Sequence, residues 1–150
     1  MKFRKANKND LPAIVQMLAD DALGKTRELY SNPLPESYYR AFDIISADNN
    51  QELIVVEDEA NEVVGTLQLS HITYIAHKGT MVTQVEAVRI RSDKRSQGIG
   101  DAMFQWVIVR AREKGARVVQ LTTDKQRPDA KRFYEKLGFV ASHEGMKLKL

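Results

Sequence analysis

The segment from Arg95 to Gly100 has the residue types and spacing that most directly indicate chemistry. It reads Arg-Ser-Gln-Gly-Ile-Gly, between an apolar strand pattern and an apolar-periodic helix pattern. The first turn of a helix leaves backbone N–H groups without partners and carries roughly +0.5 of an elementary charge. Glycines let an anion approach those groups because no Cβ blocks it. Since Arg89, Arg91 and Lys94 add positive charge nearby, the segment predicts an anion site, for which we expect a pyrophosphate.

Two familiar nucleotide-binding patterns do not fit this segment. A dinucleotide fingerprint needs a glycine where Met103 stands. A P-loop needs lysine after its last glycine, where Asp101 stands. An ordinary glycine turn between a strand and a helix remains the alternative to a ligand site.

A second motif near the end of the chain makes the first one more specific. Arg95–Gly100 matches R/Q-x-x-G-x-G/A, and Arg127–Phe139 resembles N-x-x-A-x-x-F-Y-x-x-x-G-F. Together they resemble the GCN5-related N-acetyltransferase (GNAT) family over essentially the whole chain. The run from Thr122 to Tyr134 is also similar to the aminoalkylphosphonate N-acetyltransferases, and Gln84–Val88 to the glucosamine-phosphate N-acetyltransferases. Both partial resemblances indicate a small primary amine as acceptor.

The resemblance implies a fold and a coenzyme. The expected fold is α/β (α+β): the GNAT fold, a mixed central sheet of about seven strands flanked by about four helices, with parallel central strands that splay apart. Acetyl-CoA is the implied acetyl donor. Its arm would bind the strand at Val88, Arg89 and Ile90, and its pyrophosphate the loop Arg95, Ser96, Gln97, Gly98, Ile99, Gly100 and Asp101. Arg127 replaces the family's asparagine and could meet a phosphate instead of the pantetheine amide.

Acetyl transfer by direct attack of an amine calls for a general base and a general acid. Glu86 is the carboxylate we choose as base: in a regular strand it would share a face with Val88 and Ile90, and partial burial would raise its pKa. A bulge would change that face, and a structural glutamate is the alternative. Tyr134 matches the family tyrosine that protonates the coenzyme thiolate, with core packing beside Phe133 as its alternative.

The acceptor site has no readable motif. In the family, the region between the first two helices lines the acceptor pocket, so Tyr30 and Tyr38 are candidates, and His71 and Tyr74 are added from the neighbouring strand. Exposed or core-packed roles are at least as common for each residue alone. The three histidines have no metal-ligand spacing, so no metal is assigned.

Hydrophobic periodicity and turn residues predict the elements that position these residues. The expected helices run from about residue 10 to 24, 36–47, from 99 to about 114, and 128–137. The expected strands are near 3–6, 53–56, 63–74, 81–91, 117–123, 139–141 and 146–150. The strand at 117–123 should lie parallel to that at 81–91 because a helix separates them.

Composition limits the remaining function classes. The 150 residues, 43% of them hydrophobic, suit one N-acetyltransferase domain, 1–150. A net charge of only +3 and the lack of a recognition motif argue against nucleic acid, and no apolar run suggests a membrane span. We expect a cytoplasmic protein acting on a small-molecule amine, and a homodimer is left open. The alternatives are a peptide or protein lysine acetyltransferase, and a non-catalytic coenzyme A-binding module.

Overall fold

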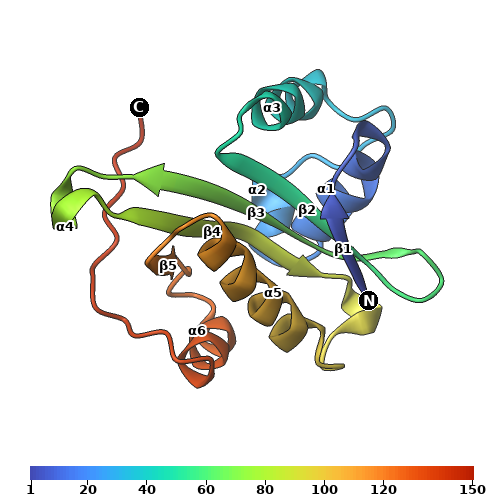
Figure 1. Ribbon diagram of the computed structural model, residues 1–150. Helices are drawn as coiled ribbons and strands as arrows, with labels where there is room; N and C mark the ends of the chain where they lie inside the picture. Colours follow the sequence, from blue (N-terminus) through green and yellow to red (C-terminus); the bar gives the residue numbers. More distant parts are fainter.

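Five strands form one sheet in the order β1-β2-β3-β4-β5, in a computed structural model that describes residues 1–150 (Figure 1). The strands are β1 (Lys2–Lys5), β2 (Gln51–Glu57), β3 (Val63–Thr73), β4 (Met81–Ile90) and β5 (Val118–Leu121). The helices are α1 (Leu11–Ala19), α2 (Gly24–Arg27), α3 (Glu36–Ala47), α4 (Ala76–Gly79), α5 (Ile99–Glu113) and α6 (Pro128–Lys136). Strands β1 to β4 pair antiparallel, and β5 pairs parallel to β4 as the intervening helix predicts.

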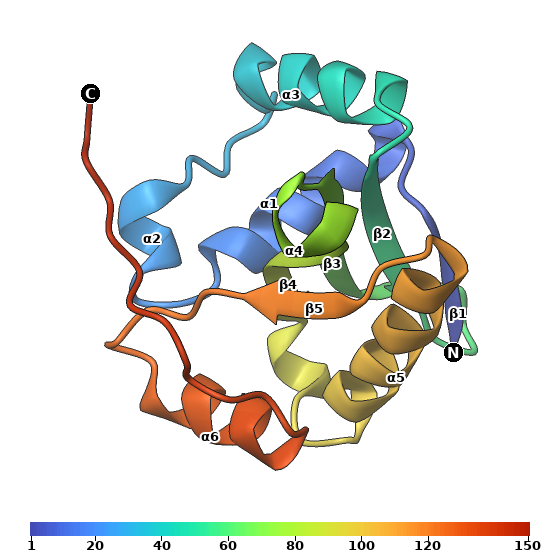
Figure 2. The ribbon, with the colours of Figure 1, turned by 60° about the vertical axis from the view of Figure 1, so that its left-hand side comes forward.

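Helices cover both faces of the sheet. α5 and α6 lie on one face, and α1 to α3 lie on the other (Figures 1 and 2). Side chains alternate along a strand, so Ile54 packs with Phe104 of α5 whereas Val55 packs with Ile14 of α1. The sheet is therefore the wall between two hydrophobic clusters. None of the helices has the length and apolar character that a membrane span requires.

A bulge in β4 changes which side chains share a face. Glu86 pairs with Gln68 and Arg89 pairs with Thr66, so three steps along β4 match two along β3. Ala87 absorbs the extra residue with a φ of 54°. Residues directly opposite each other in an antiparallel pair face the same side, and Thr66 and Gln68 are two apart. Glu86 and Arg89 therefore face the same side.

Strands β4 and β5 pair over a short length and then separate. Their register runs from Val82 opposite Val118 to Val85 opposite Leu121 and ends there. The remainder of β4, Glu86 to Ile90, has no strand on its β5 side. This confirms the splayed parallel pair implied by the resemblance.

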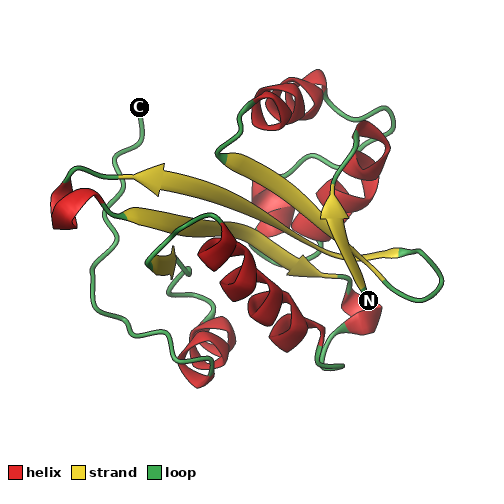
Figure 3. Cartoon of the chain, viewed as in Figure 1, coloured by secondary structure: helices red, strands yellow, loops and turns green.

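The two expected C-terminal strands are absent, so the sheet has five strands rather than about seven. The segment after α6 is irregular (Figure 3). Its apolar side chains Val140, Met146, Leu148 and Leu150 are each more than 80% exposed. Alternating apolar residues form a strand only where a neighbouring strand accepts their hydrogen bonds, and none does so here. The first helix also ends earlier than expected, at Ala19, and α2 follows as a separate turn.

Candidate active site

The anion site predicted at the glycine loop has the required local geometry. Gly98 is the N-cap of α5 with a φ of 78°, a conformation that side chains rarely adopt, and the space where its Cβ would point is open. The first bond of the helix runs from the Ala102 N–H to the Gly98 carbonyl at 3.1 Å. The N–H groups of Gly98, Ile99 and Gly100 make no hydrogen bond within the chain. These donors can therefore bind phosphate oxygens.

Gly100 serves a different purpose from Gly98. A Cβ on Gly100 would lie 3.0 Å from Cζ of Phe133 and 3.5 Å from Cδ1 of Ile90. A larger residue here would push against α6 and the end of β4. Gly100 thus keeps the loop close to the motif that begins at Arg127.

The basic residues around the loop do not form the free positive field that their spacing predicts. Arg91 pairs with Asp93 at 2.7 Å, Lys94 with Asp58 at 3.1 Å and Arg95 with Asp20 at 3.1 Å; Ser96 takes a positive φ, Gln97 donates to the Asp93 carbonyl and Asp101 is exposed on α5. Carboxylates from three other segments already accompany these cations. Backbone N–H groups are consequently the principal free donors at this turn.

The free half of β4 leads directly to this loop. Its Val88 and Ile90 carbonyls accept bonds from arginine side chains, Arg89 Nη1 at 2.8 Å and Arg95 Nε at 3.2 Å. Without a strand beside them, these residues offer a backbone edge to an extended ligand. An acyl chain on this edge would end at the N-terminus of α5.

Glu86 does not have the environment expected for it. The bulge places it on the side of Arg89 instead of that of Ile90, and the side chain is exposed, so the expected partial burial is wrong. Gln84 Nε2 donates to Glu86 Oε1 at 2.8 Å. The carboxylate is open to water and to a ligand on the α1 side of the sheet.

Tyr134 lies in an aromatic cluster with its hydroxyl near the charged residues of the site. Its ring packs edge to face against Phe104, Phe133 and Phe139, with centroids 5.4 to 5.9 Å away. Burial raises the pKa of the hydroxyl, as does the Glu86 charge, and the charges of Arg89 and Arg127 oppose the rise. The net increase keeps the proton on Tyr134 at neutral pH, which a general acid requires.

Asp21, after α1, joins two arginines that sequence patterns assigned to the coenzyme. Its Oδ2 lies 2.6 Å from Arg127 Nη2 and 3.9 Å from Arg89 Nη2, and its Oδ1 accepts from Gly24 N–H at 2.5 Å. Burial alone would raise the pKa of Asp21, but the Gly24 bond and the two cations outweigh it and lower the pKa. No sequence motif indicated this cluster, although its members are the two arginines of the two family motifs.

The acceptor candidates separate into different roles. Tyr30 is half-exposed in the segment after α2, and Tyr74 is exposed at the β3 end of the hairpin that carries α4. The Tyr38 hydroxyl donates to Glu28 at 2.8 Å and accepts from the Leu29 N–H at 3.0 Å, so it holds that segment.

His71 is buried and does not face an acceptor site. Its Nδ1 lies 2.9 Å from Thr83 Oγ1, and its Nε2 lies 3.8 Å from Glu52. Its even spacing from Leu69 on β3 turns it toward the α5 side of the sheet, and burial lowers its pKa. The acceptor role predicted for His71 is therefore wrong.

Comparison with known proteins agrees with this fold and site. The model of the acetyltransferase (GNAT) family matches residues 16–139. An aminoalkylphosphonate N-acetyltransferase of Salmonella typhimurium is 33% identical over 55% of this chain, a match that spans about half (53%) of that protein. An L-methionine sulfoximine/L-methionine sulfone acetyltransferase of Pseudomonas aeruginosa is 28% identical over 93% of this chain and 80% of its own length.

Solved structures share the fold over the whole chain. A transcriptional regulator from Bacillus halodurans C-125 superposes with a TM-score of 0.95 at 51% identity, covering 99% of both chains. Glucosamine-6-phosphate N-acetyltransferase from Arabidopsis thaliana superposes with a TM-score of 0.77 at 19% identity, covering 99% of this chain and 97% of that one.

The splayed β4–β5 pair and the glycine-capped α5 thus define a GNAT-type acyl-transfer fold. The chain belongs to the acetyltransferase (GNAT) family and is an acetyltransferase.

Proposed function

We propose that this protein transfers the acetyl group of acetyl-CoA to the primary amine of a small molecule. The observation that carries the proposal is the continuity of the free half of β4 with the unpartnered N–H groups of α5, beside the Tyr134 hydroxyl. Two relatives that act on small molecules by name, an aminoalkylphosphonate N-acetyltransferase and a methionine sulfoximine acetyltransferase, support an acceptor of this kind.

The coenzyme would lie along this continuous surface. Its pyrophosphate would accept bonds from the N–H groups of Gly98 to Gly100, where the missing Cβ of Gly98 leaves room. Its pantetheine arm would pair with the backbone of Val88 and Ile90. A backbone N–H on the free half of β4 would then stabilise the oxyanion that forms when the amine attacks the thioester carbonyl.

Proton transfers would be shared between Glu86 and Tyr134. An alkylamine with a pKa of about 10.4 needs roughly 4.6 kcal/mol to lose its proton at pH 7, so a base has a large effect. Glu86 is exposed, and we infer that it accepts this proton through a water molecule. Tyr134, whose raised pKa keeps it protonated, would donate to the departing thiolate. Positioning of both reactants would supply the remaining acceleration.

The test is thiol release from acetyl-CoA across a panel of amines. The panel contains aminoalkylphosphonates, amino acids, amino sugars, polyamines and a lysine peptide. We expect turnover with small amines and little with the peptide. Turnover with the peptide alone would favour a protein lysine acetyltransferase. Coenzyme binding without turnover on any amine would contradict the proposal and favour a non-catalytic coenzyme A-binding module.

A further inference from the structure

Two arginines and one carboxylate form a buried cluster on the α1 side of β4. Arg127 and Arg89 approach the same Asp21 oxygen, at 2.6 and 3.9 Å. The Arg89 side chain is 19% exposed, and its Nε, which is fully buried, has no hydrogen-bond partner. Its Nη1 donates only to the adjacent Val88 carbonyl. Arg89 therefore keeps unused donor capacity in a place from which water is largely excluded.

The cluster carries more positive charge than its own acids balance. The other carboxylates nearby are already engaged: Glu28 accepts from the Tyr38 hydroxyl, Asp124 pairs with Arg27 at 2.9 Å, and Asp20 pairs with Arg95. Burial and the Arg127 charge together lower the pKa of the Arg89 guanidinium, which is the mark of a cation short of anionic partners. An added anion would relieve that deficit.

The anion that fits here is distinct from the coenzyme pyrophosphate. The phosphate loop adjoins Ile90 and Phe133 through Gly100, on the α5 and α6 side. The bulge at Ala87 turns Arg89 to the other side of β4, the side that Glu86 also faces. Arg89 and the proposed base therefore border the same space, where an acceptor amine would have to lie.

We propose that Arg89 and Arg127 bind an acidic group of the acceptor, so that the substrate is an amine that also carries a carboxylate or a phosphonate. The oxyanion would take charge-assisted bonds from both guanidinium groups, and the amine would point toward Glu86. Asp21 holds the two arginines in place before the substrate arrives, as an internal substitute for its acid. This inference rests on the proposed acetyltransferase function for the role of the amine.

Binding without catalysis provides the first test. Ethylphosphonate and propionate carry the acid but no amine, and 1-propanol is their neutral counterpart. In calorimetry on the coenzyme A-saturated protein, we expect at least one acid to bind and 1-propanol not to bind. Arg127→Gln should weaken that binding roughly 10- to 100-fold. Asp21→Asn should strengthen it, because the competing carboxylate is neutralised while the side chain keeps its shape.

Turnover provides the second test, with acceptors matched in length. β-Alanine and 2-aminoethylphosphonate are compared with 1-aminopropane as kcat/KM. We expect the better acid to exceed 1-aminopropane at least tenfold, and Arg89→Gln or Arg127→Gln to abolish most of that ratio. The KM for acetyl-CoA should stay nearly constant. Arg132→Gln, an exposed change elsewhere on α6, is the matched control and should leave the ratio unchanged.

The outcomes separate this inference from the function on which it rests. Turnover of 1-aminopropane as fast as of both acids, with no binding of either acid, would overturn the acidic-substrate inference and leave the acetyltransferase proposal standing. Acid binding without any turnover would support the anion site and contradict the transferase role. A rise in the KM for acetyl-CoA in Arg127→Gln, with the acid preference intact, would assign the cluster to a coenzyme phosphate. If Arg89→Gln does not fold, Arg127→Gln and Asp21→Asn carry the test.

Discussion

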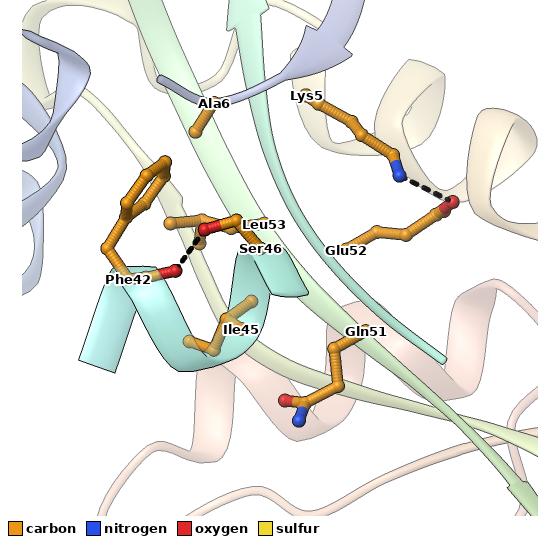
Figure 4. Close-up of a pocket in the computed structure, with 8 residues that line it drawn as sticks. All are labelled: Lys5, Ala6, Phe42, Ile45, Ser46, Gln51, Glu52 and Leu53. Carbon is orange, nitrogen blue, oxygen red and sulfur yellow. Dashed lines mark hydrogen bonds and ion pairs between the residues drawn. The ribbon is translucent and has the colours of Figure 1, made fainter. Parts of the chain in front are cut away.

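Two clusters of charge lie on opposite faces of the sheet, and each is built around a single carboxylate. Glu52 on β2 pairs with Arg110 of α5 at 2.5 and 2.9 Å, and the amines of Lys5 and Lys114 are 3.8 and 3.6 Å away. Figure 4 shows the Lys5 contact from the pocket beside α3. On the other face, Asp21 joins Arg89 and Arg127.

The clusters differ in which charge is buried. Glu52 has no exposed side-chain surface, whereas its cations reach solvent: Lys5 is 67% and Arg110 is 30% exposed. In the other cluster the most buried charge is the cation Arg89, and its anion Asp21 is 30% exposed. A buried anion surrounded by flexible cations is satisfied and closed. A buried cation with spare donors can still accept a ligand, so the comparison assigns stability to the Glu52 cluster and function to the Asp21 side.

Tyr134→Phe should produce the largest effect and confine it to catalysis. The variant removes the hydroxyl that faces the Asp21 side while the ring keeps its aromatic contacts. We expect kcat to fall by about 10²–10⁴-fold, with acetyl-CoA affinity and melting temperature nearly unchanged. Steady-state kinetics and calorimetry measure the two quantities. A kcat close to that of the wild type would make Tyr134 a core residue only.

Glu52→Gln should show the reverse pattern. It leaves Arg110 without its main partner in a half-buried position, so we expect the free energy of unfolding to fall by about 2–4 kcal/mol. The kcat/KM of the folded fraction should not change. Glu113→Gln is the matched control, because Glu113 pairs with the same arginine but is 56% exposed, and it should cost less than about 1 kcal/mol. Urea unfolding compares the three proteins, and equal losses in both variants would contradict the comparison.

Gly98→Val should weaken acetyl-CoA binding at least about tenfold, since its side chain would enter the space left for phosphate. The positive φ adds a stability cost of about 1–2 kcal/mol that does not concern the ligand. Gly115→Val isolates that cost, because Gly115 has a φ of 83° and open space around it. Calorimetry should find weaker binding in the first variant alone. Unchanged affinity in a folded Gly98→Val would remove the loop from the coenzyme site.

The smallest predicted effect is a pH dependence of stability from His71. Its folded-state pKa is lowered, so in the window below about 6.5 the unfolded chain binds a proton that the folded chain does not. The contribution is complete above that pH and is lost as the pH falls, by at most about 1.4 kcal/mol per unit. Urea unfolding at pH 7.5, 6.5 and 5.5 should give a shallower slope for His71→Gln than for the wild type. Identical slopes would contradict this assignment.

Local sequence patterns were sufficient for several parts of this molecule. The glycine loop, the helix that follows it and the parallel strand beyond were readable because turn residues and hydrophobic periodicity act within a few positions of the chain. The family resemblance followed from two such local motifs, and the matched family model agrees with it.

Other features depended on which segments pack together. The bulge at Ala87, which sets the side of Glu86 and Arg89, is a mismatch in register between β3 and β4 that no spacing within β4 reveals. The burial of His71 follows from the helix above it, and the absence of C-terminal strands follows from the lack of a pairing neighbour. The sequence thus specified which groups could take part in chemistry. Their side of the sheet, their burial and their charge partners were decided by contacts between residues distant along the chain, because strand register and ion pairing are properties of the folded chain.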